Sequence, residues 1–315
     1  MLDRRDLILA ATAAAAATAI PFTQAAAADD ESSLLPVTFG LNMSTLRGQG
    51  LSVPDQIDVA AKAGYNAVEP WVRDLQKFQS EGGKLADVKK QIEDAGMFVC
   101  SAIGFANWIV DDDAARAQAL EEAKREMELV RSIGGTHIAA PPVGLHSGES
   151  VSPPLDVIGN RYRALLDVGA SVGVIPQLEL WGFSPTISKL AELAYVATAA
   201  SHPDACVLPD FYHVYKGGND FEGLKMIEAS RMHCFHINDY PGTPGIDKIS
   251  DKDRVFPGDG VCELPVIIRG LIDRGFTGTF SLELFNPEYW KRDALAVASE
   301  GLEKSQRVVA KAMLL

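Results

Sequence analysis

Four short apolar runs in the second half of the chain each end near a side chain that can bind a metal ion. These side chains are Glu179, Asp210, His236 and Glu283. The runs that carry them span residues 176–181, 206–210, 232–239 and 279–283. A single acid at the end of a strand is often an ordinary surface charge. Four metal-binding side chains on consecutive apolar runs instead indicate one shared site at one end of a parallel sheet.

The chemistry of this set favours a divalent cation. Three carboxylates and one imidazole suit Mn²⁺, Mg²⁺ or Co²⁺ and suit copper poorly. We therefore expect one divalent metal ion, with Mn²⁺ preferred and Mg²⁺, Co²⁺ or Zn²⁺ as alternatives.

The elements that must position these residues alternate regularly. Strand-like runs at 37–42, 67–69, 97–103 and 136–140 come before the four runs above. Helices are predicted at 53–63, 85–95, 112–133, 155–172, from 184, 221–229, 264–274 and 287–315. Eight β/α units predict an α/β fold, a single-domain (β/α)8 TIM barrel over residues 37–315. A doubly wound open sheet also alternates, but residues 42–48 lack the GxGxxG turn that usually follows its first strand.

At these positions the chain resembles the xylose-isomerase-like TIM barrels, a family that includes ketose 3-epimerases, hydroxypyruvate isomerases and inosose-processing enzymes. The family's Asp-x-x-His is present as Asp210-Phe-Tyr-His213, and its His-x-x-Asp as His236-Ile-Asn-Asp239. Its Arg before a Pro-Gly-x-Gly turn is present at residues 254–260. The resemblance covers essentially all of residues 37–315.

The resemblance implies a mechanism and a role for each residue. Glu179, Asp210, His236 and Glu283 would hold the metal, and the two glutamates would also move a proton next to a carbonyl through an enediolate. This is sugar isomerase or epimerase chemistry. Substrate oxygens would be bound by His213 and Arg254. Asp239 would support the site without binding the metal.

Two further residues have alternative interpretations. Glu69, at the end of the second strand, could bind substrate hydroxyls or could be a structural acid. Trp108 is the preferred platform for a sugar ring among the tryptophans near strand ends, and core packing is the alternative.

The first 28 residues resemble a twin-arginine export signal. Arg4 and Arg5 precede an alanine-rich apolar run, and residues 26–28 offer a small-residue cleavage site. Residues 29–36 are expected to form a short tether. The sequence thus predicts a periplasmic or otherwise exported protein, with no stable membrane insertion after cleavage. The apolar run is too short and too rich in alanine for a comfortable membrane span.

The charge and the cysteine content of the chain limit the partners and substrates that we expect. The net charge of −13 argues against nucleic acid, because an acidic surface repels phosphate backbones. Export, and the absence of basic clusters at residues 258–260 and 286–288, favour an unphosphorylated sugar or polyol as substrate. The four cysteines have no CxxC spacing, and three lie in apolar runs, which indicates buried thiols although a bridge stays open. The sequence leaves the choice between monomer and homo-oligomer open.

Three other functions are alternatives to the isomerase or epimerase. The same site could cleave 3-oxo-glycosides by β-elimination, which would make the protein a lyase. A non-catalytic sugar-binding barrel is another alternative, although binding alone does not need two opposed glutamates. Phosphodiester cleavage of the endonuclease-IV type is disfavoured, because it requires more histidines than this chain places near strand ends.

Overall fold

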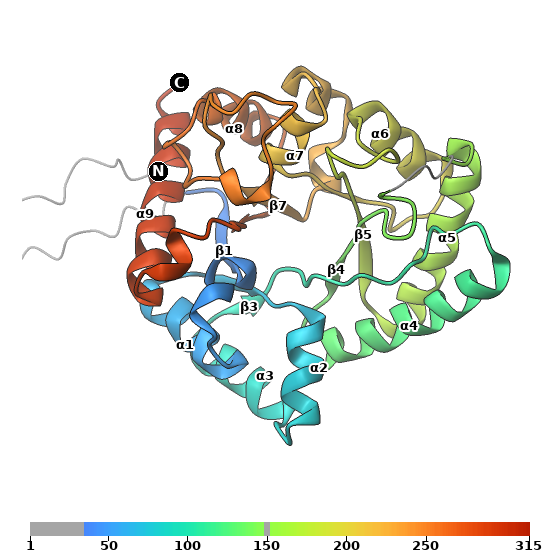
Figure 1. The fold of residues 1–315 in the computed structure, drawn as a ribbon, viewed down its shortest axis with the longest axis horizontal. Helices are drawn as coiled ribbons and strands as arrows, with labels where there is room; N and C mark the ends of the chain where they lie inside the picture. Colours follow the sequence, from blue (N-terminus) through green and yellow to red (C-terminus); the bar gives the residue numbers. More distant parts are fainter. Residues whose placement is uncertain (1–34, 148–151) are drawn as a thin grey trace, which may run out of the picture. The chain divides into compact units, whose positions relative to one another are not determined.

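Parallel strands alternate with helices in residues 35–147 and 152–315, the part of the chain that the computed structural model describes (Figure 1). The strands are β1 (Thr38–Asn42), β2 (Ala67–Glu69), β3 (Phe98–Val99), β4 (His137–Ala140), β5 (Ile175–Glu179), β6 (Val207–Leu208), β7 (Cys234–Ile237) and β8 (Thr279–Leu282). The helices are α1 (Val53–Ala63), α2 (Val72–Ser80), α3 (Leu85–Asp94), α4 (Asp113–Ser132), α5 (Leu155–Val172), α6 (Leu190–Ala199), α7 (Phe211–Lys216), α8 (Leu264–Asp273) and α9 (Ala294–Met313). The predicted signal peptide, and residues 29–34 of the predicted tether, lie outside the described residues.

Backbone pairing joins the strands into a closed ring in sequence order. One sheet has the order β3-β2-β1-β8-β7, and the other has the order β4-β5-β6. Ala139 N donates to Ala102 O at 2.8 Å, and His236 N donates to Pro209 O at 2.9 Å. These two bonds connect the sheets, because Ala102 lies just beyond β3 and Pro209 just beyond β6. All the strand pairs are parallel, and the helices surround the ring, so the predicted TIM barrel is confirmed (Figure 1).

Capping side chains set several helix ends. Ser52 caps α1 by accepting from Asp55 N at 3.3 Å, and Gly64 ends that helix in left-handed backbone with φ of 94°. Asp112 caps α4 by accepting from Ala115 N at 2.7 Å. None of the helices over residues 35–147 and 152–315 is long and apolar enough to cross a membrane.

Three predicted helices are corrected by the structure. The helix expected from residue 184 begins only at Leu190, because the Ser184 hydroxyl donates to Thr186 O at 2.6 Å and holds a turn there. After β6 the α-helix is α7, and residues 221–229 contain short 3-10 turns instead. The last helix begins at Ala294, where Asp293 caps it, and not at residue 287. The polar helix α2 is absent from the sequence prediction.

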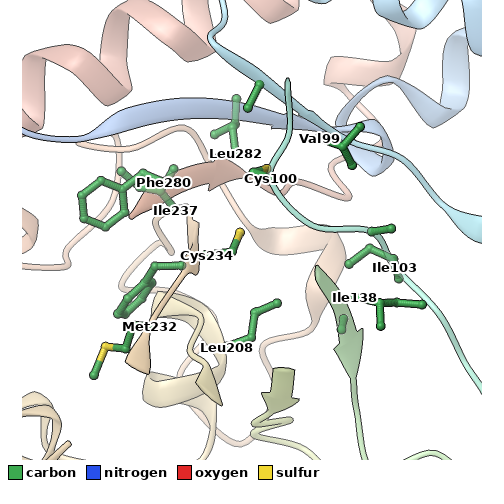
Figure 2. Close-up of a cluster of buried hydrophobic side chains, with 14 of the residues drawn as sticks. Val99, Cys100, Ile103, Ile138, Leu208, Met232, Cys234, Ile237, Phe280 and Leu282 are labelled. Carbon is green, nitrogen blue, oxygen red and sulfur yellow. The ribbon is translucent and has the colours of Figure 1, made fainter. Parts of the chain in front are cut away.

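A continuous hydrophobic core fills the space around the strands. Figure 2 shows part of it, with side chains from or next to β3, β4, β6, β7 and β8: Val99, Cys100, Ile103, Ile138, Leu208, Met232, Cys234, Ile237, Phe280 and Leu282. Three cysteines are buried, Cys262 is half-buried, and all four are free. The prediction of buried thiols at positions 100, 206 and 234 is confirmed.

Candidate metal centre

Three carboxylates surround the Nδ1 atom of His236. The nearest oxygens belong to Glu283 at 3.3 Å, Asp210 at 3.6 Å and Glu179 at 3.9 Å. These side chains come from the C-terminal ends of β5, β6, β7 and β8, which neighbour one another in the ring. The structure therefore brings together all four residues that the sequence predicts as metal ligands.

The cluster is suited to a divalent cation. His236 Nδ1 is buried and has no hydrogen-bond partner in the described part of the chain. Four buried carboxylates, including that of Glu69, lie within 4 Å of the His236 ring nitrogens. Arg254 is the one buried arginine among the described residues, and it pairs with two of them, Asp210 and Glu283. Buried charge that is not compensated is costly. A divalent metal held by Glu179, Asp210, His236 and Glu283 would use the free nitrogen and offset the excess negative charge.

Glu69 contacts the other side of the same imidazole. Its carboxylate lies 3.1 Å from His236 Nε2, and it also accepts from Ser281 Oγ at 2.6 Å and Asn42 Nδ2 at 2.9 Å. Burial alone would raise the pKa of Glu69, but His236 and these hydrogen bonds lower it. Because Glu69 is fully buried and bonded to three protein groups, the structure favours its interpretation as a structural acid over a binder of substrate hydroxyls.

Two asparagines that the sequence analysis missed connect the site. Asn42 donates to Glu69 and also to Glu283 Oε1 at 3.2 Å, because strand register places Asn42 beside Glu69. Asn238 donates to Asp210 Oδ2 at 3.0 Å. Their positions in the sequence could have identified them as site residues, because Asn42 ends the first strand and Asn238 lies inside the His-x-x-Asp motif.

Arg254 is held against the predicted ligands. Its Nη1 donates to Asp210 at 2.8 Å and to Glu283 at 2.9 Å, and its Nη2 donates to His213 Nε2 at 3.1 Å. Burial alone would lower the pKa of Arg254, but Asp210 and Asp251 raise it. Burial and Arg254 lower the pKa of His213. Both side chains are buried and bonded to protein groups, and their role toward substrate oxygens stays a prediction.

Asp239 organises the loop that follows Arg254. Its carboxylate accepts backbone hydrogen bonds from Tyr240, Gly258, Gly260 and Cys262 at 2.8–3.1 Å. Gly260 is required there, because a Cβ atom would lie 2.2 Å from Asp239 Oδ1. Asp239 thus holds the Pro-Gly-Asp-Gly turn, and none of these hydrogen bonds joins it to a candidate ligand side chain. Its supporting role toward the site stays a prediction.

The accessible surface of the cluster belongs to its two glutamates. The side chains of Glu179 and Glu283 are each 5% exposed, whereas those of Asp210 and His236 are 0% exposed. Burial, reinforced by Glu283, raises the pKa of Glu179 to about 8. Burial alone would lower the pKa of His236, but Glu283 and Glu69 raise it. The two glutamates are therefore the ligand candidates that face whatever enters the site.

Aromatic side chains gather next to the candidate ligands, beyond the C-terminal strand ends that form the mouth of a TIM barrel. We call this set the aromatic collar: Trp71, Phe105, Trp181, Phe183 and Phe285. Neighbouring ring centroids are 6.1 Å apart for Trp71–Phe285, 5.2 Å for Trp71–Phe105, 6.3 Å for Phe105–Trp181 and 5.2 Å for Trp181–Phe183. The collar comes from segments after β2, β3, β5 and β8.

Trp108 does not belong to this collar, and the structure favours the alternative of core packing over a sugar platform. The residue is 1% exposed, its Nε1 donates to Pro141 O at 2.7 Å, and its ring contacts Tyr162. Trp108 therefore packs in the core between α4, α5 and β4.

Comparison with known proteins agrees with this architecture. A family model described as "Xylose isomerase-like TIM barrel" matches residues 57–307. Among curated proteins, an inosose isomerase of Bacillus velezensis is 26% identical over 271 residues, covering 85% of this chain and 95% of its own. A 3-dehydroshikimate dehydratase of Pseudomonas aeruginosa is 22% identical and covers 80% of this chain, over 39% of its own length.

Solved structures show the same fold. A structure of the IOLI protein with a bound zinc atom has a TM-score of 0.81 at 22% identity, covering 88% of this chain and 99% of its own. An L-ribulose 3-epimerase has a TM-score of 0.71 at 16% identity, covering 88% of this chain and 96% of its own.

Proposed function

Because the chain belongs to the xylose isomerase-like TIM barrel family, we propose that it is a divalent-metal-dependent sugar or polyol isomerase or epimerase. The observation that carries this proposal is the convergence of Glu179, Asp210 and Glu283 on the unpartnered Nδ1 atom of His236. Pure sugar binding would not need this concentration of buried carboxylates.

Glu179 and Glu283 carry the proton steps. They extend from β5 and β8, which are not neighbours in the ring, so they approach a bound substrate from different sides. One carboxylate takes the proton from the carbon beside the carbonyl. The other returns a proton to the opposite face of that carbon, which gives epimerisation, or a proton moves to the adjacent carbon, which gives isomerisation. A bound divalent metal supplies polarisation of the carbonyl and stabilises the charge that develops on its oxygen.

The named relatives support this class of chemistry. An inosose isomerase and an L-ribulose 3-epimerase act on unphosphorylated substrates by their names. A 3-dehydroshikimate dehydratase supports elimination as a second candidate. In that case the same proton is removed, and the electron pair expels a β-substituent, as in cleavage of a 3-oxo-glycoside.

Incubation in D₂O tests the proposal. The Mn²⁺-loaded protein is mixed with free ketoses, inososes, 3-oxo-glycosides and keto-polyol acids, and deuterium in recovered material is measured by mass spectrometry. We expect deuterium at a carbon next to the carbonyl for at least one compound. Release of the glycosidic substituent would identify the lyase. The absence of exchange and turnover with every compound would reject proton abstraction and leave a binding protein.

We also propose that the protein is exported, on the basis of Arg4, Arg5 and the alanine-rich run that follows them. Export through the twin-arginine route would require both arginines. Replacing both with lysine should retain the protein in the cytoplasm of an expressing bacterium, as measured by cell fractionation. Unchanged fractionation would reject this route.

A further inference from the structure

Arg47 extends over the aromatic collar without an acidic partner. It lies in η2 (Met43–Gln49), the 3-10 turn directly after β1. Its guanidinium carbon is 4.0 Å from the centroid of Trp71 and 5.2 Å from that of Phe285. Its Nη2 atom is buried and has no hydrogen-bond partner, and no ion pair joins Arg47 to an acid within the described residues.

The two other arginines that touch the collar do have acidic partners. Arg254, whose guanidinium carbon is 5.0 Å from the Phe285 centroid, donates to Asp210, Glu283 and Asp251. Arg73, 4.3 Å from the Trp71 centroid, lies 3.8 Å from Asp74. Three guanidinium groups thus contact the collar, and that of Arg47 alone among them has no carboxylate partner in the described chain.

A half-buried guanidinium without an acidic partner costs free energy unless a ligand supplies an acceptor for its N–H groups. Burial and the neighbouring Arg73 lower the pKa of Arg47, while Glu283 raises it. Contact with two aromatic rings offsets part of the cost of burial, but it leaves the buried Nη2 group without an acceptor among the described residues. The mouth of the site therefore carries positive charge in a protein whose net charge is −13.

We propose that Arg47 binds a carboxylate of the substrate, and that the substrate class is a sugar acid or keto-polyol acid. This proposal rests on the proposed function, which places the reacting carbonyl at the metal centre. A planar guanidinium matches the two oxygens of a carboxylate. A phosphate would be expected to use additional backbone donors, and Ser44 N at the start of η2 is already bonded to Asn42 Oδ1 at 2.9 Å.

Binding of two cyclic polyols that have no ketone or aldehyde group tests this role independently of turnover. Quinate carries a carboxylate, and myo-inositol is its neutral counterpart. Calorimetry on the Mn²⁺-loaded full chain should give an affinity at least about tenfold higher for quinate. Arg47→Met keeps apolar contact with the collar and should remove this preference, while the affinity for myo-inositol changes by less than about twofold. Arg47→Lys should retain part of the preference.

Arg73→Met is the matched control, because it removes the same charge from the same indole. It should lower quinate affinity by less than about threefold, the effect of the field alone. Equal losses for Arg47→Met and Arg73→Met, an unchanged preference in Arg47→Met, or tighter binding of inositol 1-phosphate than of quinate would each overturn the proposal. Absence of deuterium exchange with every carbonyl compound would instead reject the proposed function. The comparison of quinate with myo-inositol binding could still be interpreted in that case, because it does not depend on turnover.

Discussion

The carboxylate of Glu69 lies 3.1 Å from His236 Nε2, on the side of the imidazole opposite to Nδ1. This contact fixes the ring orientation, because a carboxylate that accepts from Nε2–H leaves Nδ1 as the atom available to a cation. Ser281 and Asn42 in turn fix Glu69. The position of the candidate metal-binding nitrogen is therefore set by side chains from β1, β2 and β8.

Glu69→Gln should weaken metal binding without unfolding the barrel. The amide would bring an N–H₂ group toward donors that now point at a carboxylate, so the imidazole would lose its fixed orientation. We expect Mn²⁺ affinity to fall by about 10–100-fold in calorimetric titration. Glu126→Gln, a change at a buried glutamate on α4 away from the cluster, is the control and should bind Mn²⁺ normally. Equal affinities in both variants would contradict the orienting role.

Glu179→Gln and Glu283→Gln should each lower the rate of deuterium exchange by about 10²–10⁴-fold, because a neutral amide cannot accept the proton. Exchange would be measured in D₂O with the best substrate of the panel. Glu288→Gln, next to the same loop but exposed and paired with Lys291, should keep full activity. Exchange within about tenfold of wild type in either variant, at saturating metal, would remove that glutamate from the proton steps.

Replacing Trp108 should lower the stability of the protein, whereas replacing Trp181 should weaken substrate binding. Trp108→Phe leaves a gap in the core and an unsatisfied Pro141 carbonyl, so we expect a loss of about 1–3 kcal/mol in the free energy of unfolding. Its substrate affinity should be unchanged. Trp181→Ala removes a face of the collar and should instead weaken substrate binding. Denaturant unfolding and substrate titration would show both effects, and a binding defect in Trp108→Phe would restore it as a sugar platform.

The barrel and its four candidate ligands could be predicted because each strand of a parallel barrel is a short apolar run and its end carries the function. The choice between the two interpretations of Trp108 could not be made from the sequence, for a geometric reason. Position after a strand does not tell whether a side chain points to the mouth or between the helices. Glu69 could not be assigned either, because its partner His236 is 167 residues away and only strand order brings them together. Arg47 lies in no recognisable motif. Its lack of a carboxylate partner among the described residues can be recognised only from the three-dimensional structure.

Glu126 gives the fold a specific pH dependence. It accepts hydrogen bonds from the backbone of Phe105 and Ala106, in the loop that carries the collar, and burial raises its pKa to about 7. An acid whose pKa is higher in the folded state binds more protons there. The free energy of unfolding should therefore fall as pH rises from about 4.5 to 7, by up to about 3 kcal/mol, and should level off above that.

Glu126→Gln should remove this contribution, because the amide does not titrate. Its free energy of unfolding relative to wild type should rise by up to about 3 kcal/mol between pH 5 and pH 8. Burial lowers the pKa of His137 from its ordinary value of 6.5 to about 4. This shift makes the free energy of unfolding fall as pH decreases below 6.5, whereas Glu126 makes it rise. That slope is present in both proteins, so it cancels in the difference. Urea unfolding of both proteins at pH 5, 6, 7 and 8 provides the measurement, and parallel curves would show that Glu126 keeps an ordinary pKa in the folded protein.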